Sequence, residues 1–406
     1  MNNWKKKFII IWSGQLFSTL SSYIAQFGVV LWISIETGSA EVLSFATIAA
    51  LLPQAVLGPF AGVFVDRWNR KLTMILSDAF VAVCSAIIAL LFYLETIELW
   101  HIYLLLMLRS IGSAFQAPAM KSSVPLLAPE KELTRIASVN QSIQSVSNIC
   151  GPVLGAALLV ATDMSFLMLF DVAGAIIGCT TLMFVSIPNP ERTVGKLSLG
   201  NVMREMKEGF NAIRSKRGLT SVMAIEVLVT FFVMPVVVLL PLMTLKHFAG
   251  TPYHASLIEL LFGLGTLGGG ILLGVWNPKT RKVIMISISY IVLGACFVWS
   301  GLLSPSGFAI YAALAVVQGI AIPFYSGPFT ALLQTQVAPE FLGRVFALFD
   351  SISLLPSLVG LIATGFLADA IGISNIFTIC GIAIVLVGSS AFLIPSIMNM
   401  EDRRKK

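Results

Sequence analysis

The sequence predicts an all-α membrane protein with twelve transmembrane helices in two pseudo-symmetric six-helix bundles. Three observations predict this fold class. Of the 406 residues, 57% are hydrophobic and only 11% are charged, whereas a soluble domain carries about 25% charged residues. The apolar residues gather in long runs, and polar connections of the first half recur in the second. This composition disfavours a soluble enzyme, a nucleic-acid-binding protein and a secreted disulfide scaffold, because their surfaces must face water.

Twelve apolar runs are each long enough to cross a bilayer, for which a helix needs about 20 residues. Helices are expected because they satisfy their own backbone hydrogen bonds in lipid. The first run follows three lysines and imitates a signal peptide, but it continues too far for one, so we interpret it as an uncleaved span. The predicted spans are Phe8–Ser34, Val42–Val65, Leu72–Leu94, Trp100–Met120, Ala137–Ala161, Phe166–Val185, Leu219–Leu245, Ser256–Trp276, Val283–Leu303, Phe308–Thr330, Phe346–Leu367 and Asn375–Ile397.

The basic residues predict the orientation of these spans. If the N-terminus lies in the cytoplasm, nearly all of the 26 Lys and Arg residues fall in segments on the inner side. The exceptions are Lys246, which falls outside, and Arg109, which falls within the membrane. Because cytoplasmic loops carry an excess of Lys and Arg, we expect a multi-pass protein of the cell membrane with both termini in the cytoplasm.

The longest polar stretch, Ser186–Gly218, divides the chain. Its apolar residues recur at helical spacing among charges, which predicts a loop and an amphipathic helix on the inner surface. We therefore predict an N-terminal six-helix bundle at 1–186, a cytoplasmic linker at 187–218 and a C-terminal six-helix bundle at 219–406. Two polar connections recur about half a chain apart, for example Ala128–Arg135 and Ala338–Arg344. A six-span repeat with a ligand site between its halves is typical of transporters.

The connection after the second span combines a glycine, an acid and several bases. We expect Gly62 to allow close contact between helices and Asn69 to take the left-handed turn conformation that glycine favours. The acid and the bases are then close enough to hold the cytoplasmic ends of neighbouring helices together as a conformational latch. An ordinary basic loop is the alternative. The predicted latch residues are Gly62, Asp66, Arg67, Arg70, Asp78 and Asp350.

The segment Gly62–Lys71 resembles the loop signature of the major facilitator superfamily, and the resemblance extends over essentially the whole chain. Leu108–Gly112 resembles the second motif of that superfamily, whose arginine is linked to proton transfer. A third segment resembles the motif associated with antiporters, although Ser147 stands where the motif has a further glycine. The resemblance implies the major facilitator fold and alternating access. The residues that match the antiporter motif are Gly151, Pro152 and Gly155.

Within this superfamily, the chain resembles the macrolide efflux proteins of the drug:proton antiporter type. The resemblance implies a secondary transporter, not an enzyme, that exports macrolide-like or other amphiphilic drugs by proton antiport. It implies no cofactor, no metal and no nucleic acid as partner, and we expect a monomer. The resembling stretches are Asn3–Lys5, Gly14–Gln15, Thr37–Ala40, Arg109–Gly112, Gln141–Ser145, Arg204–Met206, Pro323–Gly327 and Leu342–Phe346.

Several alternatives stay open at this point. The cargo could be a siderophore or a lipid-like metabolite, because such exporters are related to the macrolide efflux proteins. A separate ATP-binding partner protein is a second alternative. A non-transport membrane enzyme or a receptor is less well supported, because the sequence holds no nucleophile–base pair, metal-ligand set or P-loop.

Ionisable residues inside lipid are candidates for function. Arg109 lies near the middle of the fourth span, and Asp171 lies about two turns into the sixth. Glu226 lies about two turns into the seventh. We assign these three residues to proton coupling, with either acid as the carrier of the exchanged proton. The alternatives are a structural bond from the arginine to a helix carbonyl, and capped or paired structural carboxylates.

A bulky amphiphilic cargo needs a mostly apolar cavity with a few hydrogen-bonding groups. Amide and aromatic side chains within the spans are candidates for its lining, although the amides could instead join helices and the aromatics could face lipid. The predicted cavity residues are Gln15, Tyr23, Gln26, Gln141, Gln144, Phe231 and Phe232.

The run Gly263–Gly268 has the spacing of a dinucleotide-binding fingerprint. It lies within an apolar span and follows no strand, so the fingerprint interpretation is disfavoured. Small residues three or four positions apart let transmembrane helices approach closely. We therefore expect this run to be a packing surface.

Overall fold

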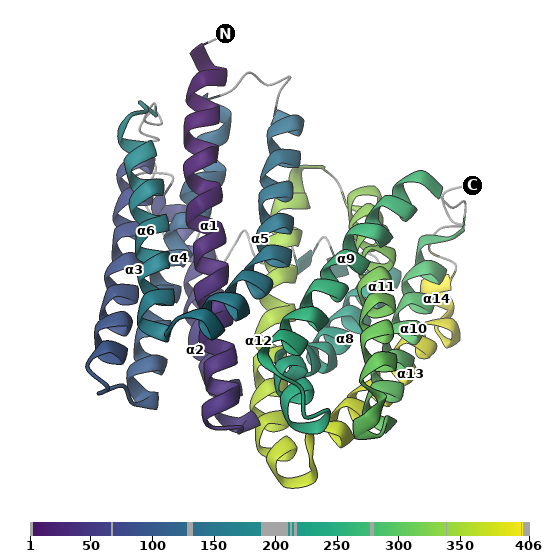
Figure 1. Ribbon diagram of the computed structural model, residues 1–406. Helices are drawn as coiled ribbons and strands as arrows, with labels where there is room; N and C mark the ends of the chain where they lie inside the picture. Colours follow the sequence, from purple (N-terminus) through teal and green to yellow (C-terminus); the bar gives the residue numbers. More distant parts are fainter. Residues whose placement is uncertain are drawn as a thin grey trace. The chain divides into compact units, whose positions relative to one another are not determined.

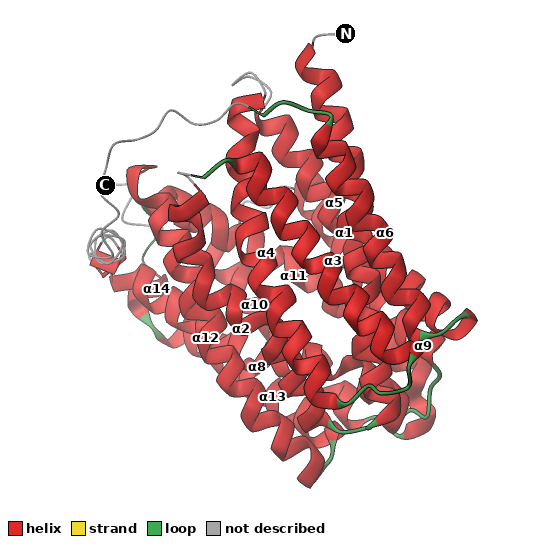
Figure 2. Ribbon diagram, turned by 90° about the vertical axis from the view of Figure 1, so that its left-hand side faces the viewer, coloured by secondary structure: helices red, strands yellow, loops and turns green. Residues whose placement is uncertain are grey.

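The computed structural model describes residues 3–65, 68–127, 133–187, 210–211, 213–214, 217–276, 280–337, 339–398 and 400. This part of the chain is helical throughout and contains no strand (Figures 1 and 2). Twelve long helices follow one another within it, as the sequence predicts. They are α1 Asn3–Glu36, α2 Ala40–Val65, α3 Arg70–Tyr93, α4 Leu99–Leu127, α5 Leu133–Ala161, α6 Met164–Met183, α8 Arg217–Leu242, α9 Pro252–Trp276, α10 Lys282–Leu302, α11 Phe308–Gln336, α12 Pro339–Ile371 and α13 Ile373–Leu393; the short elements are η2 Met243–His247, η3 Pro305–Gly307 and α14 Pro395–Met398.

Eleven of the long helices are apolar enough over 18 residues to cross a membrane. Helix α4 is the long described helix outside this set, and it carries Arg109 and Gln116 along its length. A charged side chain in the middle of a span costs about 2.5–3.5 kcal/mol on insertion. The surrounding helices therefore have to supply partners for Arg109.

The chain divides into two compact units, Met1–Glu36 with Phe45–Lys196 and Thr37–Ser44 with Leu197–Lys406. In the first unit, α1 packs against α5 and α6, and α3 packs against α4 and α6 (Figure 1). In the second unit, α8 packs against α12 and α13, and α10 packs against α11 and α13. Each of these contacts in the first unit has its counterpart in the second, which is the pattern of a six-helix repeat. The predicted linker lies mostly outside the described residues, so its boundaries and its amphipathic helix stay predictions.

Helices α9 and α11 pack at backbone distance. A Cβ atom on Gly319 of α11 would lie 2.1 Å from the carbonyl oxygen of Phe262, and one on Gly265 of α9 would lie 2.3 Å from that of Val316. A Cβ atom on Gly269, one turn further along α9, would lie 2.7 Å from the carbonyl oxygen of Ile320. Within the glycine run, Gly265 thus packs against α11 as the packing interpretation expects, whereas a Cβ atom on Gly268 would meet nothing within 4 Å.

Replacing Gly319 by Ala is expected to destabilise the second unit by about 1–3 kcal/mol, the range for overpacked interiors. The added methyl group meets backbone atoms, which cannot rotate away. Thermal unfolding in detergent measures the change. Gly268→Ala is the matched control, because a Cβ atom there meets nothing within 4 Å. Equal unfolding temperatures for the two variants would contradict the packing argument.

The first turn of α2 is capped by an acid from α12. The Asp369 carboxylate accepts hydrogen bonds from Ser39 Oγ at 2.6 Å and from the backbone N–H groups of Ala40 at 2.9 Å and Glu41 at 3.1 Å. A carboxylate at this position satisfies amides that have no partner within the helix and lies at the positive end of the helix dipole. These contacts explain why Thr37–Ser44 groups with the second unit while the rest of α2 groups with the first.

The residue before α3 differs from the prediction. Asn69 has φ −66° and ψ 105°, so it is extended and not left-handed. Its Oδ1 atom accepts a hydrogen bond from the backbone N–H of Leu72 at 3.0 Å. Asparagine is among the preferred N-cap residues because its short side chain reaches this amide. The expectation of a left-handed turn was wrong because this position starts a helix.

Candidate functional site

An ion pair lies inside the first unit, between the fourth and sixth helices. Arg109 Nη1 of α4 is 2.6 Å from Asp171 Oδ2 of α6. The two side chains are 12% and 1% exposed, respectively. The structure therefore brings together two of the three residues assigned to proton coupling. Arg109 bonds an acid rather than the helix carbonyl considered as its alternative partner.

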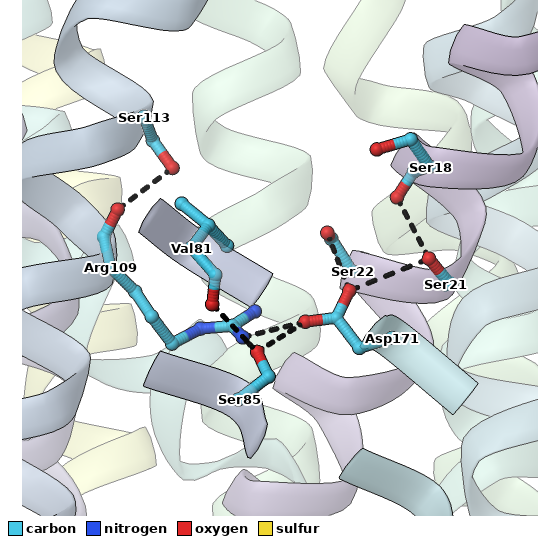
Figure 3. Close-up of polar contacts among 8 residues, drawn as sticks. All are labelled: Ser18, Ser21, Ser22, Val81, Ser85, Arg109, Ser113 and Asp171. Atoms are coloured by element: carbon cyan, nitrogen blue, oxygen red, sulfur yellow. Dashed lines mark hydrogen bonds and ion pairs between the residues drawn. The ribbon is translucent and has the colours of Figure 1, made fainter. Parts of the chain in front are cut away.

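Serine hydroxyl groups complete the surroundings of the acid (Figure 3). Ser22 Oγ of α1 donates to Asp171 Oδ1 at 2.8 Å, and Ser21 Oγ lies 3.4 Å from the same atom. Ser85 of α3 lies between the charged partners: its hydroxyl accepts a hydrogen bond from Arg109 Nη1 and donates to Asp171 Oδ2 at 2.7 Å. Both carboxylate oxygens thus have donors, as a buried charge requires.

The close approach of α1 and α6 depends on a small residue beside the acid. Gly174 lies one turn after Asp171, and a Cβ atom there would lie 2.0 Å from Ser21 Oγ. Any side chain at Gly174 would therefore push α1 away and remove its serines from the carboxylate. Sequence reasoning missed Ser21, Ser22 and Ser85, because serine is common in membrane helices. One signal in the sequence could have pointed to them: serines recur at helical spacing in the first span, and glycines recur at helical spacing in the sixth.

A cavity of about 130 Å³ adjoins the ion pair. Arg109 and Ser22 form part of its wall, so the cavity reaches two groups that bond Asp171 directly. The cavity is mostly apolar, but it has polar groups in its wall and room for several water molecules. Its other polar lining residues are Gln26, Gln54, Ser110 and Ser113. Gln26 was a predicted cavity residue, whereas the other three were not singled out from the sequence.

The remaining predicted cavity residues are distributed over both units. In the first unit, Tyr23 Oη donates to Gln144 Oε1 at 3.0 Å and joins α1 to α5. Gln15 accepts a hydrogen bond from Gln116 Nε2 at 2.9 Å. In the second unit, the rings of Phe231 and Phe232 meet edge to face with centroids 5.1 Å apart. The side chain of Gln141 lies outside the described residues.

Glu226 lies in the second unit and is 7% exposed. Its carboxylate accepts a hydrogen bond from Tyr290 Oη of α10. The ring of Tyr325 on α11 lies against that of Tyr290, with centroids 5.1 Å apart. Among the residues that the structure describes, this acid forms no ion pair. The surroundings of Glu226 thus differ from those of Asp171, which has a cation and three hydroxyl groups.

The predicted latch is only partly visible. Asp66 and Arg67 lie outside the described residues, as do the side chains of Asp350 and the surroundings of Gly62. Arg70 is the first residue of α3. Asp78 lies two turns further along α3 and is buried in the first unit. The latch as a whole stays a prediction.

The predicted antiporter motif lies where α5 meets α1. A Cβ atom on Gly151 would lie 2.8 Å from the Cβ atom of Tyr23, and one on Gly155 would lie 2.9 Å from the carbonyl oxygen of Ile24. Pro152 lies between them, inside α5. The motif residues therefore let α1, which carries the serines of the ion-pair site, lie directly against α5.

Comparison with known proteins identifies the family. The model of the Major Facilitator Superfamily matches residues 11–314 and also 222–404. The chain belongs to the major facilitator superfamily. It is accordingly a multi-pass membrane transporter, as the resemblance implied.

Members of the superfamily similar to this chain include efflux proteins. Macrolide efflux protein A of Streptococcus pyogenes is 38% identical over 98% of each chain. Multidrug efflux pump Tap of Mycolicibacterium fortuitum is 24% identical over 91% of each chain. The crystal structure of a bacterial homologue of the human lysosomal transporter Spinster covers 96% of this chain and 95% of its own, with a TM-score of 0.72 at 14% identity. That structure shares the major facilitator fold.

Proposed function

We propose that this chain is a proton-coupled exporter of macrolide-like amphiphilic drugs in the cell membrane, with both termini in the cytoplasm. The cargo class rests on the similarity to Macrolide efflux protein A and to the pump Tap. Two helical bundles that rock about a central site expose it to either side of the membrane in turn. A transporter couples proton and drug only if both bind its two states with different affinity.

The observation that carries the proton coupling is the buried Arg109–Asp171 ion pair, whose arginine lines a cavity with several polar groups in its wall. Arginine stays charged in proteins, so the acid is the member of the pair that can bind a proton. When Asp171 takes up a proton, it loses its charge and the ion pair is broken. Arg109 is then free to turn toward the polar wall of the cavity. Protonation thus changes how α4 and α6 are held to each other, which gives the two protonation states different structures.

Asp171 is the better carrier of the two candidate acids. Both of its protonation states have partners, because the carboxylate faces a cation and the carboxylic acid faces serine oxygens. Glu226 faces a neutral tyrosine hydroxyl group. An unpaired charge costs several kcal/mol in a buried site, so Glu226 is the poorer site for an acid that has to release its proton in each cycle.

Inside-out membrane vesicles test the proposal. An acidic lumen reproduces the natural gradient, and radiolabelled erythromycin is expected to accumulate as protons leave the lumen. Collapse of the gradient with a protonophore is expected to release the accumulated drug. Uptake that continues after the collapse, or that follows added ATP instead, would rule out antiport. If the gradient drives uptake of a siderophore but not of a macrolide, the cargo is a siderophore and the proposed proton antiport still holds.

A further inference from the structure

A second acid is buried in the first unit, and the proposed mechanism does not use it. Asp78 of α3 is 8% exposed. The Gln15 side chain of α1 lies beside its carboxyl group. Within the described part of the chain, Asp78 Oδ2 and Gln15 Nε2 are both buried without a hydrogen-bond partner. Gln116 of α4 donates to Gln15 Oε1 at 2.9 Å, so three helices contribute to this polar cluster.

The cluster adjoins the ion pair along α3. Asp78 and Ser85 are seven residues apart, which places them on one face of the helix and roughly 10 Å apart along its axis. Asp171 of α6 lies near enough to Asp78 for the two carboxyl groups to influence each other. Cys179, also on α6, is the other titratable group that interacts with Asp78. Arg109 of α4 faces this region through its bond to Asp171, and α1 contributes the uncharged Gln15.

The cavity reaches from the ion pair toward the cluster. Asp78 lies in the half of α3 that begins at Arg70, and Gln15 lies in the half of α1 that begins at Asn3. The cavity is lined along α3 from Ile88 to Val81, which is one turn from Asp78. Arg109 and Ser22, which bond Asp171, line the same cavity. The ion pair and Asp78 therefore border the same part of the first unit, and Asp78 is the acid nearer to Arg70.

We propose that Asp78 is a second proton-binding group that exchanges its proton with Asp171; this inference rests on the proposed antiport. In the structure, Asp171 forms an ion pair with Arg109. Asp78 forms no ion pair among the described residues, so a charge on its buried carboxyl group is costly. The proposed step is a single proton transfer from protonated Asp171 to ionised Asp78. It restores the Arg109–Asp171 ion pair, leaves Asp78 neutral and conserves the total charge.

This assignment gives the two acids different roles in moving the proton. Asp171 meets protons from the cavity, and Asp78 passes them toward the end of α3 at Arg70, which the basic residues predict to be cytoplasmic. Asp78 is therefore needed for net proton movement and not for binding of the cargo. Gln116 is a positioning residue, because its bond to Gln15 turns the Gln15 amide toward Asp78.

Proteoliposomes with radiolabelled erythromycin test the inference through two measurements. Gradient-driven uptake needs net proton movement, whereas exchange of labelled for unlabelled erythromycin at equal pH needs only the cargo site. Asp78→Asn is expected to lower driven uptake by at least about tenfold and to keep exchange within about twofold of the unmodified protein. Asp78→Glu restores the acid and is expected to recover most of the driven uptake. Ser77→Ala, at the preceding buried position, is the matched control and is expected to change neither.

Two results would overturn the inference. Asp78→Asn with normal driven uptake would show that no proton passes this residue. Asp78→Asn with both measurements lost, or Asp78→Glu without recovery, would show a purely structural role. Failure of the proposed antiport is distinguishable from either result, because the unmodified protein would then show no response to the gradient.

Discussion

Asp171→Asn is expected to abolish gradient-driven export of the cargo while exchange of cargo across the membrane continues. Asparagine keeps the size of the side chain and one oxygen, which can accept the hydrogen bond from either Ser22 or Ser85, but it cannot bind a proton. Arg109 loses its anion in this variant, yet it lines the cavity, where polar side chains and water can solvate its charge. The fold and the cargo site are therefore expected to persist.

Gradient-driven uptake and exchange of the cargo are both measured for this variant in proteoliposomes. Driven uptake is expected to fall by about 100-fold, within the range for loss of a positioned proton carrier. The exchange rate is expected to lose its dependence on pH. Asp163→Asn is the matched control on the same helix, because Asp163 caps α6 through a bond from Phe166 N at 2.8 Å and asparagine caps equally well. Driven uptake that survives in Asp171→Asn, with Glu226→Gln inactive instead, would transfer the proton site to the second unit.

Arg109→Ala is expected to destabilise the protein more than any other single change at this site. It leaves the Asp171 carboxylate buried with serine hydroxyl groups alone. Removal of one partner from a buried ion pair costs about 3–5 kcal/mol.

Thermal unfolding in detergent checks this expectation. The double variant Arg109→Gln with Asp171→Asn removes both charges and is expected to recover most of the lost stability. It is not expected to recover driven transport, because no proton carrier remains. If the double variant is as unstable as Arg109→Ala, the cost arises from lost packing of the long arginine side chain and not from an unpaired charge.

The helices could be predicted from the sequence because a lipid-spanning segment has to be long and apolar. Their ends could not be predicted as well. The predicted span Phe346–Leu367 is part of a longer helix, Pro339–Ile371. A helix can continue through less apolar residues beyond the hydrocarbon region, and hydropathy does not reveal such extensions. Asn69 was placed in the correct connection with the wrong backbone conformation. Its ability to adopt a left-handed turn mattered less than the need of α3 for an N-cap.

The two charged residues of the site could be predicted from the sequence, but the way in which they pair could not. Arg109 and Asp171 were each recognised as charges within spans, because such charges are rare there. Their pairing depends on which helices are neighbours, and hydropathy carries no information about that. Ser85 shows the same limit. It is one hydroxyl among many in the apolar runs, and only the packing of α3 between α4 and α6 places it between the two charges.

The backbone contact between α9 and α11 has a consequence for how the second unit deforms. No side chains lie between Gly265 and Gly319, so backbone atoms alone set the separation of the two helices at this point. A bulkier residue at either glycine would force the helices apart. Side chains that can change rotamer meet across this interface elsewhere, where Trp276 contacts Phe324 and His254 contacts Phe308.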